Sequence, residues 1–182
     1  MKACLLLIDL QNDFLSAWSP RARAALLDRT NHLISEFRAQ DLGLIWIYQT
    51  FKADLSDAFL EMRDYQISTV IEGTPGAEID ATLDVRDADL RIHKKRYSGF
   101  FETKLDEVLA EIDPEYVVIA GVNTHACIRM TAIDAYQRDL RVILASDCIG
   151  SLQTAHAEIT LDYLKDKIVQ LMTSEEIAAS LR

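Results

Sequence analysis

The stretch YVVIAGVNTHACIRMTAIDA, residues 116–135, consists of an apolar run, a glycine and a segment with helical spacing. The run 116–120 is β-branched and uncharged, as is typical of a central parallel strand buried on both faces. Gly121 is expected to end this strand, and Cys127 then lies where a helix begins. Ligands of open α/β sheets bind beyond the carboxyl ends of strands, and N–H groups at a helix N-terminus stabilise a thiolate. The position of Cys127 is therefore suited to a reactive thiol.

Packing is the alternative interpretation of Cys127. Free cysteine is among the most buried residue types and usually behaves as a small hydrophobe. Position alone leaves both roles open, so the other residues of the chain must decide between them.

Hydrophobic patterning elsewhere predicts an alternation of strands and helices. Six strands are expected, at residues 3–8, 44–48, 90–93, 116–120, 141–145 and 168–172. Helices are expected at residues 20–40, closed by Gly43, then at 58–63, 77–83, 103–111, after Cys127, at 154–164 and from Ser174. This alternation predicts one α/β domain over residues 1–182, with a six-stranded parallel sheet covered by helices on both faces.

Composition and charge narrow the class of partner. The net charge of −10 and a pI near 4.8 argue against a nucleic acid or an anionic membrane, because both bind basic surfaces. A small molecule is the expected ligand. No apolar run is long enough to span a membrane, and the amino end MKACLLLIDL is read as a first strand and not a signal peptide. A cytoplasmic location is therefore expected, and the widely spaced Cys4, Cys127 and Cys148 fit reduced thiols.

The segment from Gln49 to Pro75 has mixed polarity and no clean period. Long irregular segments of compact domains are usually functional or disordered. We interpret this segment as a lid or substrate loop that sets substrate choice.

Three reactive side chains follow predicted strands: Asp9 the first, Lys94 the third and Cys127 the fourth. A carboxylate can accept the proton of a thiol, while a cation and helix N–H groups lower the thiol pKa. The spacing suggests a nucleophilic Asp/Lys/Cys site, although acids and lysines are common at strand ends. The glycine-rich dinucleotide fingerprint is absent, so no nicotinamide or flavin cofactor is expected.

Three blocks of the sequence, LLLIDLQNDFL (5–15), KKRYSGF (94–100) and GVNTHACIRMTAIDAYQRDLRVILASDCIGS (121–151), lie in this order along the chain. Together they resemble the signature blocks of the isochorismatase-like cysteine hydrolases, and the match covers nearly the whole chain. This family includes nicotinamidases, N-carbamoylsarcosine amidases and related small-amide hydrolases. The resemblance implies a three-layer Rossmann-like α/β fold with a catalytic Asp, Lys and Cys.

Carried over by position, the resemblance makes Asp9 the acid/base and Cys127 the nucleophile. Lys94 matches the family lysine better than Lys95, because the family lysine stands three residues before the Tyr-Ser-Ala/Gly-Phe element, here 97–100. The resemblance also implies a cis peptide between Val122 and Asn123. The N–H groups of Asn123 and Cys127 would then form the oxyanion hole.

Two differences from other members of the family narrow the set of reactions to expect. Nicotinamidases of the family carry a metal-binding Asp-x-His element where this chain reads YQTF, residues 48–51, so no metal is expected. Isochorismate-cleaving members have glycine in place of Cys127, so the thiol argues against vinyl-ether cleavage. The candidates for substrate binding, with core packing as the alternative for the aromatic ones, are Phe14, Trp18, Gln49, Tyr97, Phe101 and His125.

The favoured hypothesis is a metal-independent cysteine hydrolase that cleaves a C–N bond of a small amide, carbamoyl or ureido compound through a Cys127 thioester. The alternative is a catalytically idle member of the same fold that binds a metabolite or a protein. A thiol redox protein is a weak third hypothesis, because no Cys-x-x-Cys pair is present and Cys148 would have to resolve Cys127. The resemblance also implies a homo-oligomer, either a dimer or a tetramer.

Overall fold

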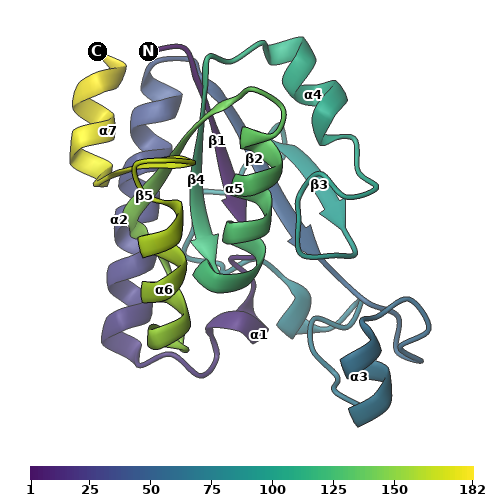
Figure 1. Cartoon of the computed structure of the whole chain (residues 1–182). Coiled ribbons are helices and arrows are strands. Elements are labelled where there is room, and N and C mark those ends of the chain that lie inside the picture. The colour runs from purple at the N-terminus through teal and green to yellow at the C-terminus, as the bar shows by residue number, and fades with distance from the viewer.

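The computed structural model describes residues 1–182, and one parallel sheet runs through it (Figure 1). The strand order is β3-β2-β1-β4-β5-β6, and every neighbouring pair is parallel. The predicted six-stranded α/β fold is confirmed. The strands are β1 (Ala3–Ile8), β2 (Gly43–Gln49), β3 (Leu90–Lys94), β4 (Tyr116–Val122), β5 (Arg141–Gly150) and β6 (Val169–Met172).

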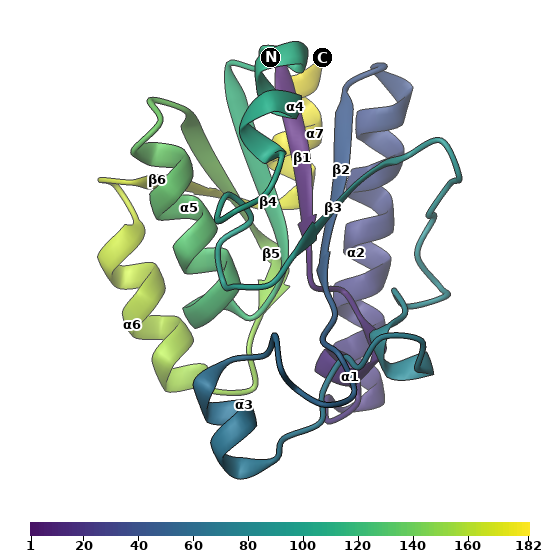
Figure 2. The ribbon, with the colours of Figure 1, turned by 90° about the vertical axis from the view of Figure 1, so that its right-hand side faces the viewer.

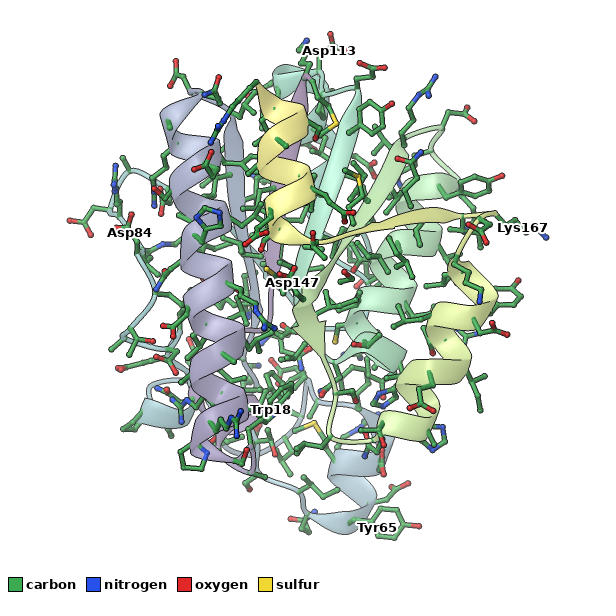
Figure 3. The ribbon with its side chains drawn as sticks, turned by 90° about the vertical axis from the view of Figure 1, so that its left-hand side faces the viewer. Trp18, Tyr65, Asp84, Asp113, Asp147 and Lys167 are labelled. Carbon is green, nitrogen blue, oxygen red and sulfur yellow. The ribbon has the colours of Figure 1, made fainter.

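Helices cover both faces of the sheet. Figure 3 looks onto α2 and α7, and Figure 2 shows α5 and α6 on the side of the sheet away from α2. Each face carries its own buried apolar cluster of 21 residues, so the sheet is the middle layer of three. The helices are α1 (Asn12–Leu15), α2 (Pro20–Ala39), α3 (Leu60–Tyr65), the 3₁₀ turn η1 (Pro75–Ala77), α4 (Leu105–Ile112), the π-helical turn η2 (Thr124–Ile128), α5 (Arg129–Tyr136), α6 (Thr154–Leu164) and α7 (Ser174–Leu181).

Two predicted boundaries are wrong. Gly43 does not close α2, because α2 ends at Ala39 and Gly43 is the first residue of β2. Asp41 makes the left-handed reversal instead, with φ of 53°. Gly121 does not end β4 either. It lies within the strand at φ of 125°, where a side chain would overlap the carbonyl of Ile8 on β1.

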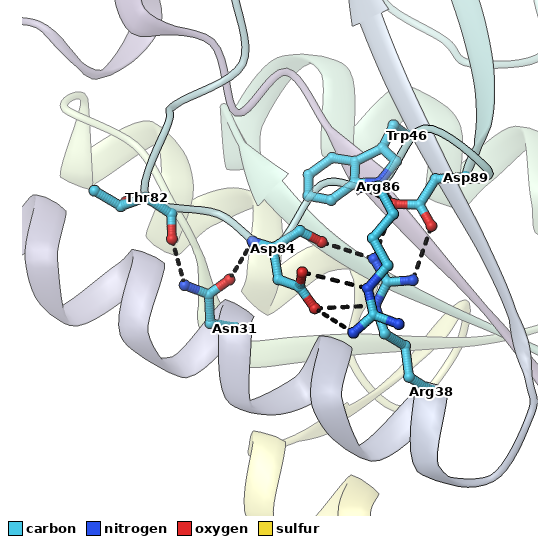
Figure 4. A network of polar contacts seen from close by, with 7 residues as sticks. All are labelled: Asn31, Arg38, Trp46, Thr82, Asp84, Arg86 and Asp89. Carbon is cyan, nitrogen blue, oxygen red and sulfur yellow. Dashed lines mark hydrogen bonds and ion pairs between the residues drawn. The ribbon is translucent and has the colours of Figure 1, made fainter.

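The predicted helix at 77–83 is also wrong, since only η1 forms there. Lateral contacts to α2 replace the helical hydrogen bonds (Figure 4). From α2, the Asn31 side chain donates to the Thr82 carbonyl and accepts from the Asp84 N–H. Further along, Arg38 forms a two-point ion pair with Asp89 at 2.8 Å for each contact. The segment is therefore held extended along α2.

Asp89 is the anchor of this contact network. Burial alone would raise the pKa of its carboxyl. However, the Arg38 guanidinium, the Arg86 N–H and the Trp46 indole N–H all donate to it and hold that pKa at about 2. The carboxylate thus stays charged over the whole physiological range and ties β2, α2 and the segment before β3 together.

No helix in the structure combines the length and the apolar character that a bilayer span requires. The two chain ends lie next to each other (Figure 1), with the amino group of Met1 3.4 Å from the Ser180 carbonyl oxygen.

Candidate active site

The three predicted site residues meet at the carboxyl edge of the sheet. Asp9 directly follows β1, Lys94 is the last residue of β3, and Cys127 lies in η2 just after β4. β1 is between β2 and β4, and β3 is beyond β2, so Lys94 must reach across the end of β2. It does so beside Gln49, its partner in the β2–β3 register.

The ammonium group of Lys94 joins these residues. Its Nζ donates to Asp9 Oδ2 at 2.8 Å and to Gln49 Oε1 at 3.0 Å, and it lies 3.4 Å from Cys127 Sγ. All three donors of the ammonium group are therefore used. Asp9 and Lys94 are each 1% exposed, and Gln49 and Cys127 are each 4% exposed, so the contacts operate away from bulk water. Of the two adjacent lysines, Lys94 is the one that contacts Asp9 and Cys127.

The charges of the cluster decide its resting protonation. Burial raises the pKa of Asp9, while the Lys94 ammonium opposes that shift. Burial would lower the pKa of Lys94, but the neighbouring Asp9 carboxylate raises it instead. The pKa of Cys127 is raised far above its ordinary range by burial and by the Asp9 charge, which together outweigh Lys94. Lys94 therefore lowers the thiol pKa as expected, but burial and the Asp9 charge outweigh it, and the resting Cys127 carries its proton.

One oxygen of the Asp9 carboxylate is unused. Oδ2 binds Lys94, but the buried Oδ1 has no hydrogen-bond partner. The residue sits in the left-handed region with φ of 53°, and its N–H donates to the Ile47 carbonyl at 2.9 Å. A buried carboxylate oxygen without a partner is costly in a purely structural role, so this oxygen is available to accept a proton.

The loop between β4 and η2 has the backbone form that the resemblance implies. The Val122–Asn123 peptide is cis. None of the backbone hydrogen bonds outside the helices and strands uses the Asn123 N–H as donor, whereas the Asn123 carbonyl accepts from Ala126 and Ile128. The Asn123 N–H is therefore free to donate to an oxygen beside Cys127.

Gln11 is a site residue to which the sequence analysis assigned no role. It is fully buried, and its side chain holds the backbone of Gln49 through both N–H and carbonyl, at 3.0 and 2.8 Å. The same amide donates to the Ala77 carbonyl at 2.6 Å. Gln11 thus fixes the end of β2, from which Gln49 meets Lys94. Its position two residues after Asp9 in the first block was the only signal.

The aromatic candidates for substrate binding are less buried. Tyr97 is 44% exposed and stacks on Phe59, with ring centroids 4.6 Å apart. Burial raises the pKa of its hydroxyl, and the residue follows Lys94, whose Nζ is 3.4 Å from Cys127 Sγ, by three positions. Phe101 is half exposed, and no hydrogen bond or ring contact joins it to the site.

The other candidates lie at or near the same edge of the sheet. His125 is two residues before Cys127, and its Nδ1 is 2.8 Å from Ser151 Oγ. Trp18 is partly buried and its Nε1 has no hydrogen-bond partner. Figure 3 shows it at the end of the molecule that carries α3. Phe14 is partly buried and contacts one of the two large clusters.

The basic residues after Lys94 anchor the segment 49–75 to the sheet. Lys95 Nζ forms an ion pair with Asp57 at 2.7 Å and donates to the Thr50 carbonyl at 2.6 Å. Arg96 donates to the Asp57 and Lys95 carbonyls and lies over the Phe59 ring. The segment also has its own small apolar cluster, which includes Phe51, so it is a packed unit beside the site.

The structure brings together no group of three or more His, Cys, Asp or Glu side chains that could hold a metal. Within residues 48–51, where the resemblance placed the metal-binding element of nicotinamidases, Gln49 accepts a hydrogen bond from the Lys94 ammonium. The positive charge of Lys94 would repel a metal ion bound beside it. The absence of a metal remains a prediction.

A family model for the isochorismatase domain matches residues 3–176. The chain belongs to the isochorismatase family. A probable inactive nicotinamidase of Arabidopsis thaliana is 32% identical to it over 143 residues, covering 74% of this chain and 73% of that protein. The maleamate amidohydrolase of Pseudomonas putida is 24% identical over 188 residues, covering 100% of this chain and 87% of that protein.

A solved structure has the same architecture. The isochorismatase family protein of Desulfovibrio vulgaris superposes with a TM-score of 0.89 at 25% identity, over 99% of this chain and 98% of that one. The isochorismatase fold predicted from the three sequence blocks is thus confirmed.

Proposed function

We propose that this protein is a metal-independent cysteine hydrolase that cleaves a C–N bond of a small amide, carbamoyl or ureido compound. The observation that carries the proposal is the buried Lys94 ammonium, which contacts both Asp9 and Cys127. Burying three ionisable side chains together is costly, and such clusters are typical of catalytic sites. Amidohydrolase relatives within the isochorismatase family support the same reaction class.

Acylation begins with the Cys127 thiol. Asp9 Oδ1 takes the thiol proton as Sγ attacks the amide carbonyl carbon, and the carbonyl oxygen becomes an oxyanion. The Asn123 and Cys127 N–H groups donate to that oxyanion. Asp9 then passes its proton to the nitrogen, the C–N bond breaks, and ammonia or an amine leaves a Cys127 thioester.

In deacylation, water takes the place of the thiol as the nucleophile. Asp9, again a carboxylate, takes a proton from water, and the hydroxide attacks the thioester carbon. The C–S bond breaks, the acid product leaves, and the proton returns from Asp9 to Cys127. Lys94 keeps its proton throughout and stabilises whichever of Asp9 and Cys127 is charged.

In this proposal Gln49, Tyr97, His125, Trp18, Phe14 and Phe101 are the groups that contact substrate. The segment 49–75 sets which substrate fits, because Lys95 and Arg96, which directly follow Lys94, hold it beside the site.

Ammonia release from a panel of small amides and ureido compounds tests the proposed function. We expect release by the wild type that does not change after incubation with a chelator, since no residue group suited to a metal lies at the site. Loss of activity on chelation, restored by adding back a metal, would contradict a metal-independent mechanism.

The catalytically idle alternative also has support, because a relative at 32% identity is described as a probable inactive nicotinamidase. In that case the buried Cys127 thiol would be inert. No ammonia release from any compound of the panel, together with a Cys127 that is unreactive toward iodoacetamide near neutral pH, would favour this alternative.

We extend the proposal to a homo-oligomer. The outer face of α6 exposes large apolar side chains, with Ile159 67% and Tyr163 54% exposed. Such a face is a liability in a monomer. Light scattering is expected to give a multiple of the mass of one chain, and Ile159→Arg is expected to shift the protein toward the monomer. A monomeric wild type would contradict this part of the proposal.

A further inference from the structure

The cations around Cys127 are already engaged within the protein. Lys94 binds Asp9 and Gln49, and Lys95 binds Asp57 and the Thr50 carbonyl. An anionic substrate group would have to compete with these short contacts.

The remaining nearby cations are engaged as well. Arg96 donates to two backbone carbonyls, and Arg129, two residues after Cys127, lies over the Tyr163 ring of α6. The imidazole of His125 lies near His156, with ring centroids 5.7 Å apart. Burial and then the His156 charge lower the pKa of His125, which keeps its ring neutral at pH 7. The Arg96 and Arg129 guanidinium groups are thus held by uncharged partners within the protein, and the neutral His125 ring offers no charge to a carboxylate.

Acidic and neutral groups, by contrast, are available at this edge. Glu61 on α3 lies two residues after Phe59, whose ring stacks on Tyr97, and it has no ion-pair partner within 4 Å. Trp18 Nε1 is a buried neutral donor without an acceptor. Its ring packs on Gly150, which pairs in the sheet with Val122, the residue before Asn123.

We infer that the site takes small amides or ureides that carry no carboxylate or other anionic group. This inference rests on the proposed function, because it specifies the substrate class of the same Cys127 site. Neutral donors such as Trp18 Nε1 satisfy amide or carbonyl oxygens, whereas an anion would lose its hydration without gaining an ion pair.

Iodoacetamide and iodoacetate test the inference without a known substrate, because they differ in charge and hardly in size. The rates of Cys127 alkylation by the two reagents are measured by peptide mass spectrometry, which separates Cys127 from Cys4 and Cys148. We expect the iodoacetamide-to-iodoacetate ratio at Cys127 to exceed the ratio at 2-mercaptoethanol by about 10-fold. A ratio at or below that of 2-mercaptoethanol would overturn the inference.

A matched pair of variants tests the electrostatic cause. Tyr97 is 44% exposed and lies three residues after Lys94, so Tyr97→Arg adds a cation on the Lys94 side of the site, while Tyr97→Gln removes the ring alone. The ratio is expected to fall by about 10-fold in Tyr97→Arg and to stay high in Tyr97→Gln. An unchanged ratio in Tyr97→Arg would overturn the charge argument. A Cys127 that reacts with neither reagent would contradict the proposed function itself, and the inference with it.

Discussion

Replacing Asp9 with asparagine is expected to lower kcat by about 10³-fold on any amide that the wild type hydrolyses. Asparagine has nearly the same shape but cannot take the Cys127 proton, and general-base catalysis contributes roughly 10²–10⁴-fold. The resting thiol is protonated, since burial and the Asp9 charge raise its pKa, so no thiolate exists without a base. Steady-state ammonia release measures the loss.

Asp13→Asn is the matched control for this prediction. Asp13 is another aspartate of the first sequence block, and its Oδ2 accepts from the Val70 N–H at 2.7 Å. The same acid-to-amide change there is expected to leave kcat within about threefold of wild type, because the asparagine oxygen can still accept from the Val70 N–H and the base is untouched. Equal losses in Asp9→Asn and Asp13→Asn would mean that the Asp9 effect is structural.

Lys94→Met is expected to lower the free energy of unfolding by roughly 3–5 kcal/mol at pH 7.5, because it leaves the Asp9 carboxylate buried without a counter-ion. The Lys94 side chain is fully buried and that of Asp9 is 1% exposed, so water cannot replace the lost contact. Urea denaturation followed by circular dichroism measures the change.

The loss of stability in Lys94→Met is expected to depend on pH. Without Lys94, burial leaves the pKa of Asp9 in the folded protein raised above its unfolded value. A group with a raised folded pKa favours folding at low pH, and this contribution is lost as the pH rises through the folded pKa. The deficit of Lys94→Met relative to wild type should therefore shrink on acidification.

Two variants separate this effect from simple packing. The double variant Asp9→Asn with Lys94→Met removes both charges and is expected to recover much of the lost stability. Lys95→Met breaks an ion pair whose lysine is 34% exposed, and is expected to cost less than about 1 kcal/mol. A Lys94→Met deficit that is independent of pH and no larger than that of Lys95→Met would contradict the ion-pair argument.

The sheet and the site edge were predictable because they depend on long, uninterrupted signals. The uncharged runs 3–8 and 116–120 are typical of buried central strands, and Asp9, Lys94 and Cys127 lie at or after the ends of parallel strands that meet at one edge. The family resemblance added the choice of Lys94 over Lys95 and the cis Val122–Asn123 peptide, which spacing alone does not encode.

The errors arose where tertiary contacts override local preference. Residues 77–83 do not form a helix because Asn31 and Arg38 on α2 bind the carbonyls of Thr82 and Asp84. Gly121 is needed inside β4 by the close approach of Ile8 on β1, which sequence spacing does not reveal. Gln11 escaped notice because its role is to hold the backbone of Gln49, a residue 38 positions away.

The most direct test of the central claim is ammonia release by Cys127→Ala beside the wild type, on an amide from the panel that the wild type hydrolyses. The account predicts that Cys127→Ala loses at least about 10³-fold in kcat while its circular dichroism spectrum and urea midpoint stay close to wild type. Hydrolysis by a folded Cys127→Ala protein at a rate near that of the wild type would show that no Cys127 thioester is formed, and would contradict the account.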